Sequence, residues 1–206
     1  VTGVQTCALP ISNALVALQR HAEAITNYDQ ALAIAPESPR VHWNRALALL
    51  RAGDFDRGWK EYEWRWKVDY LSLQPRDFPA QLLWLGERSL EGKTILLHAE
   101  QGLGDTIQFV RYVPVIAGMG ANVILEVQPP LKTLLSGLDG AGMVIAKGEE
   151  LPPFDLHCPL LSLPLACKTR LETIPSSAAY LSASAERVAY WASQLPKSEM
   201  PRVGVV

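Results

Sequence analysis

The 206 residues include 19 Lys and Arg against 21 Asp and Glu, which gives a formal net charge of −2, and 49% of them are hydrophobic. Such a composition supports a packed core, argues against intrinsic disorder, and lacks the basic surplus typical of nucleic-acid binding. No apolar run reaches the roughly 18 to 20 residues that cross a bilayer, so no transmembrane segment is predicted. The three cysteines (Cys7, Cys158 and Cys167) form no CxxC pair, which favours a reducing, cytoplasmic setting.

The two ends of the chain depart from the pattern of the rest. Residues 1–11 resemble the conceptual translation of a sequencing adapter, and they show neither a Met start nor a signal-peptide pattern. We therefore expect residues 1–11 to be a non-native segment in which Cys7 has no biological role. Residues 202–206 predict a strand that has only begun. We expect the chain to be a fragment of a longer protein.

Residues 12–67 predict packed helices, because apolar residues recur at helical spacing and prolines end the first run at Pro36 and Pro39. Like residues recur with an offset of 34 positions: Ala14 and Ala48, Leu15 and Leu49, Tyr28 and Tyr62. A helix-turn-helix period of this length is that of tetratricopeptide repeats. The segment resembles such repeats, and we expect it to bind a protein partner.

The second repeat departs from the first at two small residues. Gly58 and Arg65 stand where the first repeat has Ala24 and Ala31. Four aromatic residues crowd its last helix, namely Trp59, Tyr62, Trp64 and Trp66. Terminal repeats are often atypical because one face meets another part of the protein. We therefore expect these aromatic residues to dock onto the next domain, rather than to form a ligand-binding cage.

Residues 68–92 form a predicted connector, since prolines and glycines are scattered through mixed residues. Trp84 lies in a run of four large apolar residues, so we expect it to be buried against a neighbouring domain.

Strands and helices alternate from residue 93 onward. The predicted strands are Thr94–His98, Asn122–Val127, Met143–Ala146, 155–159 and 202–206, and the predicted helices are 106–117, 130–138 and 183–195. Residues 160–165 predict a short helical or looping segment. Alternation of this kind predicts a Rossmann-like α/β lobe over residues 93–206, with a doubly wound parallel sheet and right-handed crossovers.

The glycine turn, residues 101–105, joins the first strand to the first helix of this lobe. Such turns place free backbone N–H groups at the carboxyl edge of a sheet, where α/β folds bind ligands. A dinucleotide fingerprint is absent, because Ile107 stands where its third glycine is needed, and no GK[ST] sequence marks a P-loop. The glycines permit positive φ or close approach of a ligand. Asp105 has two interpretations, a helix N-cap and a catalytic carboxylate.

Residues 93–114 resemble the first strand, turn and helix of the heptosyltransferase-like glycosyltransferases (family 9). Their motif is a Gly-Asp pair at the start of the first helix followed by a proline, matched here by Gly104, Asp105 and Pro114. The likeness extends over about residues 90–206, and bacterial proteins that place tetratricopeptide repeats before such a domain look most similar. The resemblance implies that residues 93–206 are the truncated N-terminal, acceptor-side lobe of a two-lobed GT-B fold.

The resemblance also implies a chemistry. Asp105 would be the general base that takes a proton from an acceptor hydroxyl as it attacks a nucleotide-sugar, and the predicted substrate contacts are Glu100, Gln101, Gly102, Leu103 and Gly104. The nucleotide-sugar is a donor substrate rather than a cofactor, and no metal is expected. Much of the donor site would belong to a C-terminal lobe, so the fragment alone is expected to be inactive.

The alternative is a non-catalytic repeat scaffold whose transferase-like lobe is degenerate and only docks. Two further polar sites are expected to have structural roles rather than catalytic ones. His98 is expected to be a structural histidine. His157 and Cys158 are expected to serve packing, since no partner base accompanies the thiol.

Overall fold

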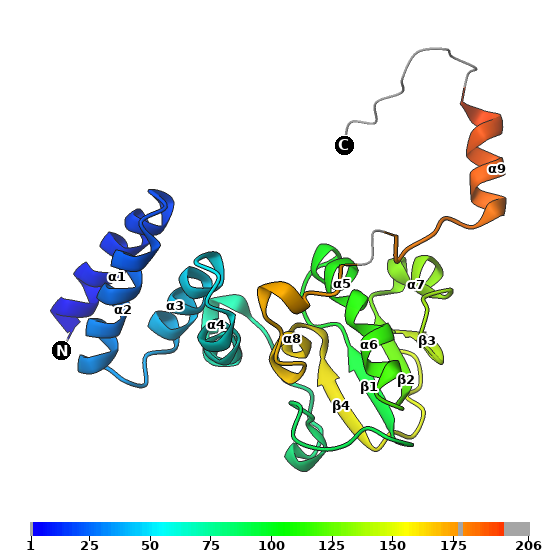
Figure 1. Ribbon diagram of the computed structural model, residues 1–206, viewed down its shortest axis with the longest axis horizontal. Coiled ribbons are helices and arrows are strands. Elements are labelled where there is room, and N and C mark those ends of the chain that lie inside the picture. Colours follow the sequence, from blue (N-terminus) through cyan, green and yellow to red (C-terminus); the bar gives the residue numbers. More distant parts are fainter. Residues whose placement is uncertain (1, 177–178, 196–206) are drawn as a thin grey trace.

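The computed structural model describes residues 2–176 and 179–195, with side chains from Leu9 onward. Helices occupy one end of the molecule, and a parallel sheet with its own helices occupies the other (Figure 1). The helical end comprises α1 (Thr2–Ala17), α2 (His21–Ile34), α3 (Pro39–Arg51), α4 (Phe55–Tyr62) and the 3₁₀ helix η1 (Glu63–Lys67).

The helices α1 to α4 pack in sequence as two helical hairpins. Small residues let them approach closely, since Ala24, Ala31 and Ala48 are at most 2% exposed. Ala14 is exposed although its counterpart Ala48 is buried. The reason is position, because α3 packs against both α2 and α4, whereas among the described helices α1 packs mainly against α2. The last α-helix of this part, α4, ends at Tyr62, and the chain continues as η1.

The sheet has four parallel strands in the order β3-β2-β1-β4. They are β1 (Thr94–His98), β2 (Asn122–Val127), β3 (Met143–Ala146) and β4 (Leu156–Pro159). The first three match the predicted strands, and β4 begins one residue later than predicted. The predicted strand at residues 202–206 lies outside the described residues.

The helices that follow β1 along the chain are shorter than predicted. They are α5 (Leu103–Phe109), η4 (Val110–Tyr112), α6 (Val113–Gly118), α7 (Pro129–Leu135), η5 (Leu160–Ser162), α8 (Leu163–Ala166), η6 (Leu171–Thr173) and α9 (Ala185–Gln194). The single helix predicted at residues 106–117 is instead α5, η4 and α6. Pro114 in the first turn of α6 has no N–H to continue an α-helical ladder from α5.

The two faces of the sheet are covered differently. Ile95, Leu97 and Leu125 face the layer formed by α5, α6 and α7. The opposite face carries Leu96, Ile124 and Ile145, against which Phe78, Leu151 and Phe154 pack. The strand order reverses at β1, as the doubly wound prediction requires, but no helix among the described residues contributes to this second cluster. Residues 147–155, which lead from β3 to β4, contain no helix that could cover that face.

The connector is fastened to the sheet rather than free. It contains two 3₁₀ turns, η2 (Asp69–Leu71) and η3 (Ala80–Leu82). Trp84 is 2% exposed, and its backbone N–H donates to the carbonyl of His157 at 2.9 Å. Leu83 also forms a parallel bridge with His157. The expected burial of Trp84 is confirmed.

One of the hydrophobic clusters joins the last repeat to the sheet. Trp43 and Tyr62 belong to the same buried cluster as Leu97 and Val110. Trp59 meets the ring of Phe109 edge-on, with centroids 6.2 Å apart. Two of the four aromatic residues therefore dock the repeat as expected. Trp64 instead stacks on His42 within the repeat, and Trp66 lies under Arg65.

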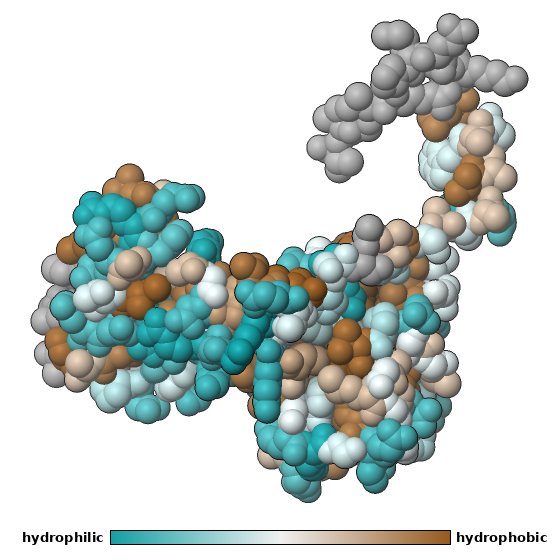
Figure 2. Space-filling model, viewed as in Figure 1, coloured by the Kyte–Doolittle hydropathy of each residue, from teal (hydrophilic) through white to brown (hydrophobic). Residues whose placement is uncertain are grey.

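The helix α9 stands apart from the sheet (Figure 1) and buries none of its residues. Apolar residues lie on its surface (Figure 2), among them Val188 and Trp191, which are 56% and 55% exposed.

Candidate functional site

The glycine turn lies at the carboxyl edge of the sheet, between β1 and α5. The helix begins three residues before the predicted start, so Gly102 is the residue before its first turn and Asp105 is its third residue. The prediction that Asp105 is the N-cap is therefore wrong. Its Oδ2 accepts a hydrogen bond from the Gly102 N–H at 3.0 Å, so the carboxylate closes the turn from inside the helix.

Side chains from β2 and α5 hold the glycine turn in place. Gln128 directly follows β2, and its Nε2 donates to the carbonyl of Gln101 at 2.7 Å. Its Oε1 accepts from the Thr106 hydroxyl at 2.9 Å. The Thr106 N–H donates to the carbonyl of Gly102 at 3.1 Å. These hydrogen bonds hold the turn in one conformation.

Neither glycine of the turn is required by backbone geometry. Gly102 has φ −72, and Gly104 has helical backbone geometry. A Cβ at Gly104 would meet no heavy atom within 4 Å. Glycine costs about 1 kcal/mol relative to alanine inside a helix, so its presence here has no structural benefit. The space above Gly104 is open, which leaves room for a ligand to approach the backbone closely. Leu103, beside it, is 45% exposed.

Glu100 is occupied by an ion pair with the repeats. Both of its oxygens accept from Arg65, at 2.7 Å from Nε and 3.1 Å from Nη2. The Arg65 side chain is 0% exposed and that of Glu100 is 4% exposed. Glu63 and Ser162 complete the Arg65 cluster, accepting from Arg65 at 2.6 Å and 2.8 Å. Any contact of Glu100 with a substrate would compete with this pairing.

Burial and charge pairing oppose each other in the Arg65 cluster. Burial raises the pKa of Glu100, and the Arg65 guanidinium only partly opposes this effect. Burial alone would lower the pKa of Arg65, but Glu100 and Glu63 together outweigh it and raise that pKa, so the guanidinium stays charged. The sequence analysis did not predict the buried ion pairs of Arg65, although its position in the repeat could have indicated them. Arg65 occupies the repeat position of Ala31, which is 2% exposed. An arginine at a buried repeat position needs anionic partners.

A cavity of about 400 Å³ opens at the carboxyl ends of β1 and β3, a volume within the range of ligand pockets. Its lining includes Trp66 from η1, Arg76 from the connector, His98 from β1 and Lys147 after β3. Arg76 forms an ion pair with Glu126, which is 2% exposed.

His98 is a buried structural histidine at the edge of this cavity. Its Nε2 lies 3.2 Å from Nδ1 of His157. Burial, together with the charges around it, lowers the pKa of His98 to about 3. The ring is therefore neutral near pH 7, which leaves it poorly suited to act as a general base there. Cys158 is fully buried, and burial raises its pKa well above the ordinary value, so its thiol stays protonated.

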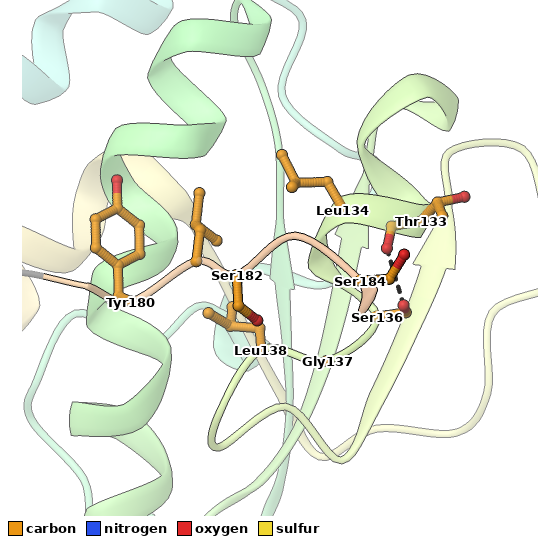
Figure 3. Close-up of a pocket in the computed structure, with 9 residues that line it drawn as sticks. Thr133, Leu134, Ser136, Gly137, Leu138, Tyr180, Ser182 and Ser184 are labelled. Carbon is orange, nitrogen blue, oxygen red and sulfur yellow. Dashed lines mark hydrogen bonds between the residues drawn. The ribbon is translucent and has the colours of Figure 1, made fainter. Parts of the chain in front are cut away.

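A smaller pocket of about 180 Å³ lies between α7 and the segment that leads to α9 (Figure 3). Hydroxyl groups line it, and the Ser136 hydroxyl donates to the carbonyl of Thr133 at 2.9 Å. Its volume falls below the roughly 300 Å³ of typical ligand pockets. Within the ranges 2–176 and 179–195, no three His, Cys, Asp or Glu side chains gather as metal ligands. In the same ranges, no helix is long and apolar enough to cross a membrane.

Comparison with known proteins finds a tetratricopeptide repeat in the helical part. Residues 13–53 match the TPR repeat family, which covers α2, α3 and part of α1. The chain is 28% identical over 195 residues to Protein FlbA of Caulobacter vibrioides (strain ATCC 19089 / CIP 103742 / CB 15). That alignment covers 84% of the chain and 32% of FlbA, so the chain spans about a third of the length of this relative. No solved structure matches. Neither match identifies a glycosyltransferase domain.

Proposed function

We propose that this chain is part of a sugar transferase, with helical repeats that bind a protein and a sheet lobe that receives the acceptor. Asp105 takes the proton of an acceptor hydroxyl while that oxygen bonds to the anomeric carbon of a nucleotide-sugar. The bond from that carbon to the phosphate oxygen breaks, and the nucleoside diphosphate leaves. The donor is bound mainly by a lobe that follows this one, in a GT-B arrangement.

The observation that carries this proposal is the glycine turn itself. Oδ2 of Asp105 is fixed by the Gly102 N–H, and no other hydrogen bond within the described residues engages the carboxylate. Oδ1 is free to meet a hydroxyl at hydrogen-bonding distance, which general-base catalysis requires. Open space above Gly104 gives the acceptor access. The sequence resemblance of residues 93–114 supports the same role for the pair Gly104 and Asp105.

The rest of the proposal concerns partners and location. Tetratricopeptide repeats present extended surfaces for other proteins, so the repeats recruit a protein partner or a protein acceptor. The cysteines Cys158 and Cys167 are free thiols, which supports a reducing, cytoplasmic setting. In this proposal, four of the predicted substrate contacts touch the acceptor directly: Gln101, Gly102, Leu103 and Gly104. Glu100 acts indirectly, through its ion pair with Arg65.

Substitution of Asp105 tests the proposal. Asp105→Asn keeps the shape of the side chain and an oxygen that accepts from Gly102, but it removes the base. We expect the natural full-length protein to lose roughly 10²- to 10⁴-fold in kcat, the usual contribution of a general base, with unchanged thermal stability. Gly104→Ala should lower kcat/KM without destabilising the fold. The matched control is Asp139→Asn, at an exposed loop position. Transfer by Asp105→Asn at the wild-type rate would remove Asp105 from the mechanism.

The TPR match also favours a second candidate, a non-catalytic scaffold. In that case the sheet lobe only docks, and the protein binds a partner through α1 to α4 without transferring sugar. Full-length protein that binds no nucleotide-sugar, yet still captures its partner through the repeats, would decide for the scaffold.

A further inference from the structure

The glycine turn is held from two directions. On one side, Gln128 bonds the carbonyl of Gln101, as described above. On the other side, the repeats contact the two residues that lead into the turn. Arg65 binds both oxygens of Glu100, and the Tyr62 hydroxyl lies 3.5 Å from Nε2 of Gln101. The turn therefore lies between β2 and the last helical segment of the repeats.

The contacts of Arg65 reach several elements at once. Its guanidinium donates to Glu63 in η1, to Glu100 after β1 and to Ser162 after β4. The Ser162 hydroxyl donates in turn to Glu63 at 2.9 Å. The planar fork of an arginine can serve such partners together, and a lysine ammonium cannot reproduce this geometry. The group is fully enclosed, so no water replaces a lost partner without rearrangement.

We propose that Arg65 is a positioning residue through which the repeats set the conformation of the glycine turn. The repeats are then part of the site, and not an independently tethered interaction module. The role of the turn in sugar transfer rests on the proposed function above. The physical coupling between Arg65 and the turn does not.

Hydrogen exchange tests the coupling in the chain as it stands. In Arg65→Lys, the amides of Gly102 and Thr106 should exchange at least roughly tenfold faster, because the hydrogen bonds that protect them depend on the conformation of the turn. Amides of β2 and α2 should keep their wild-type rates. Arg57→Lys is the matched control, since Arg57 lies on α4 with a side chain that is 59% exposed. It should leave exchange in the turn unchanged.

A second variant covers the case in which Arg65→Lys does not fold. Glu100→Gln keeps the size of the side chain and an acceptor oxygen but loses the charge, and it should produce the same local increase. Wild-type exchange in the turn of both variants would overturn the proposal. An equal increase in α2, β2 and the turn would also overturn it, because it would indicate general destabilisation alone.

The kinetic readout separates this proposal from the proposed function. If Asp105 is the base, Arg65→Lys should lower kcat at least roughly tenfold with little change in KM, since a misplaced base weakens the chemical step more than substrate binding. Unaltered kcat in that variant, alongside an inactive Asp105→Asn, would overturn the positioning role. A fully active Asp105→Asn would sink the proposed function, while exchange in the turn would still decide the coupling.

Discussion

Buried polar side chains on the second face of the sheet satisfy one another. His98 pairs with His157, and Glu126 pairs with Arg76. His98 and Glu126 are neighbours in the register of β1 and β2. Burial disfavours the charged form of an imidazole, so His98 and His157 are held in the neutral form. The stability of the fold therefore depends on the pH at which each imidazole ring becomes protonated.

Acid should destabilise the protein through His98. Its folded pKa of about 3 lies below the ordinary value of 6.5. The stability from neutral His98 is thus complete above about pH 6.5 and is lost as the pH falls toward the folded pKa. The free energy of unfolding should drop by about 1.4 kcal/mol per pH unit in the range below pH 6.5 and above the folded pKa. Urea unfolding between pH 8 and pH 5 measures this drop.

Replacement of the ring isolates this effect. His98→Gln retains a polar side chain for His157 and does not titrate, so its unfolding free energy should depend less on pH. Some slope should remain, because burial lowers the pKa of His157 as well. A pH dependence identical to that of the wild type would show that His98 is not the source.

At the scale of elements, the strands were predictable because each is a short apolar run bounded by breakers. That pattern depends only on local burial, and β1, β2 and β3 match it to the residue. The start of α5 was not predictable in the same way. Glycine at positions 102 and 104 disfavours a helix, but the Asp105 carboxylate accepts a hydrogen bond from the Gly102 N–H and stabilises the first turn. This hydrogen bond outweighs the low helix propensity of the two glycines.

The connector also has an element-scale requirement, at Gly86. This residue has φ +98, and a Cβ there would lie 2.2 Å from the carbonyl oxygen of Ala166 in α8. Gly86→Ala should therefore destabilise the protein by roughly 3 kcal/mol or more, from backbone strain and overpacking together. Thermal and urea unfolding measure the loss.

Gly92→Ala is the control for strain alone. Gly92 also has positive φ, at +66, but a Cβ there meets nothing within 4 Å. Its cost should be about 1 to 2 kcal/mol. Equal losses in the two variants would mean that the connector is not packed against α8 in the way described.

At the scale of the whole molecule, the junction between repeats and sheet is what the sequence could not specify. Glu100 and Arg65 are 35 residues apart, and no local pattern links them. The aromatic residues of the last repeat predicted that docking occurs, but not which of them would dock. Trp64 has the same chemistry as Trp59 and faces His42 instead. The partner of each side chain is decided by how the two regions pack.

Because the core is shared, the repeats and the sheet should unfold together. Trp59 packs against Tyr62 and Phe109, and its indole N–H is buried without a partner among the described residues. Trp59→Ala removes the ring that joins the two regions, so it should lower the unfolding free energy by about 3 kcal/mol. It should also separate one cooperative transition into two. Far-ultraviolet circular dichroism follows the helices, and hydrogen exchange of β1 and β2 follows the sheet.

Trp191→Ala is the matched control, because Trp191 is 55% exposed on α9 and should change stability by less than about 0.5 kcal/mol. If the helices and the sheet of Trp59→Ala still unfold in one transition at the wild-type midpoint, other residues of the shared core couple the two regions.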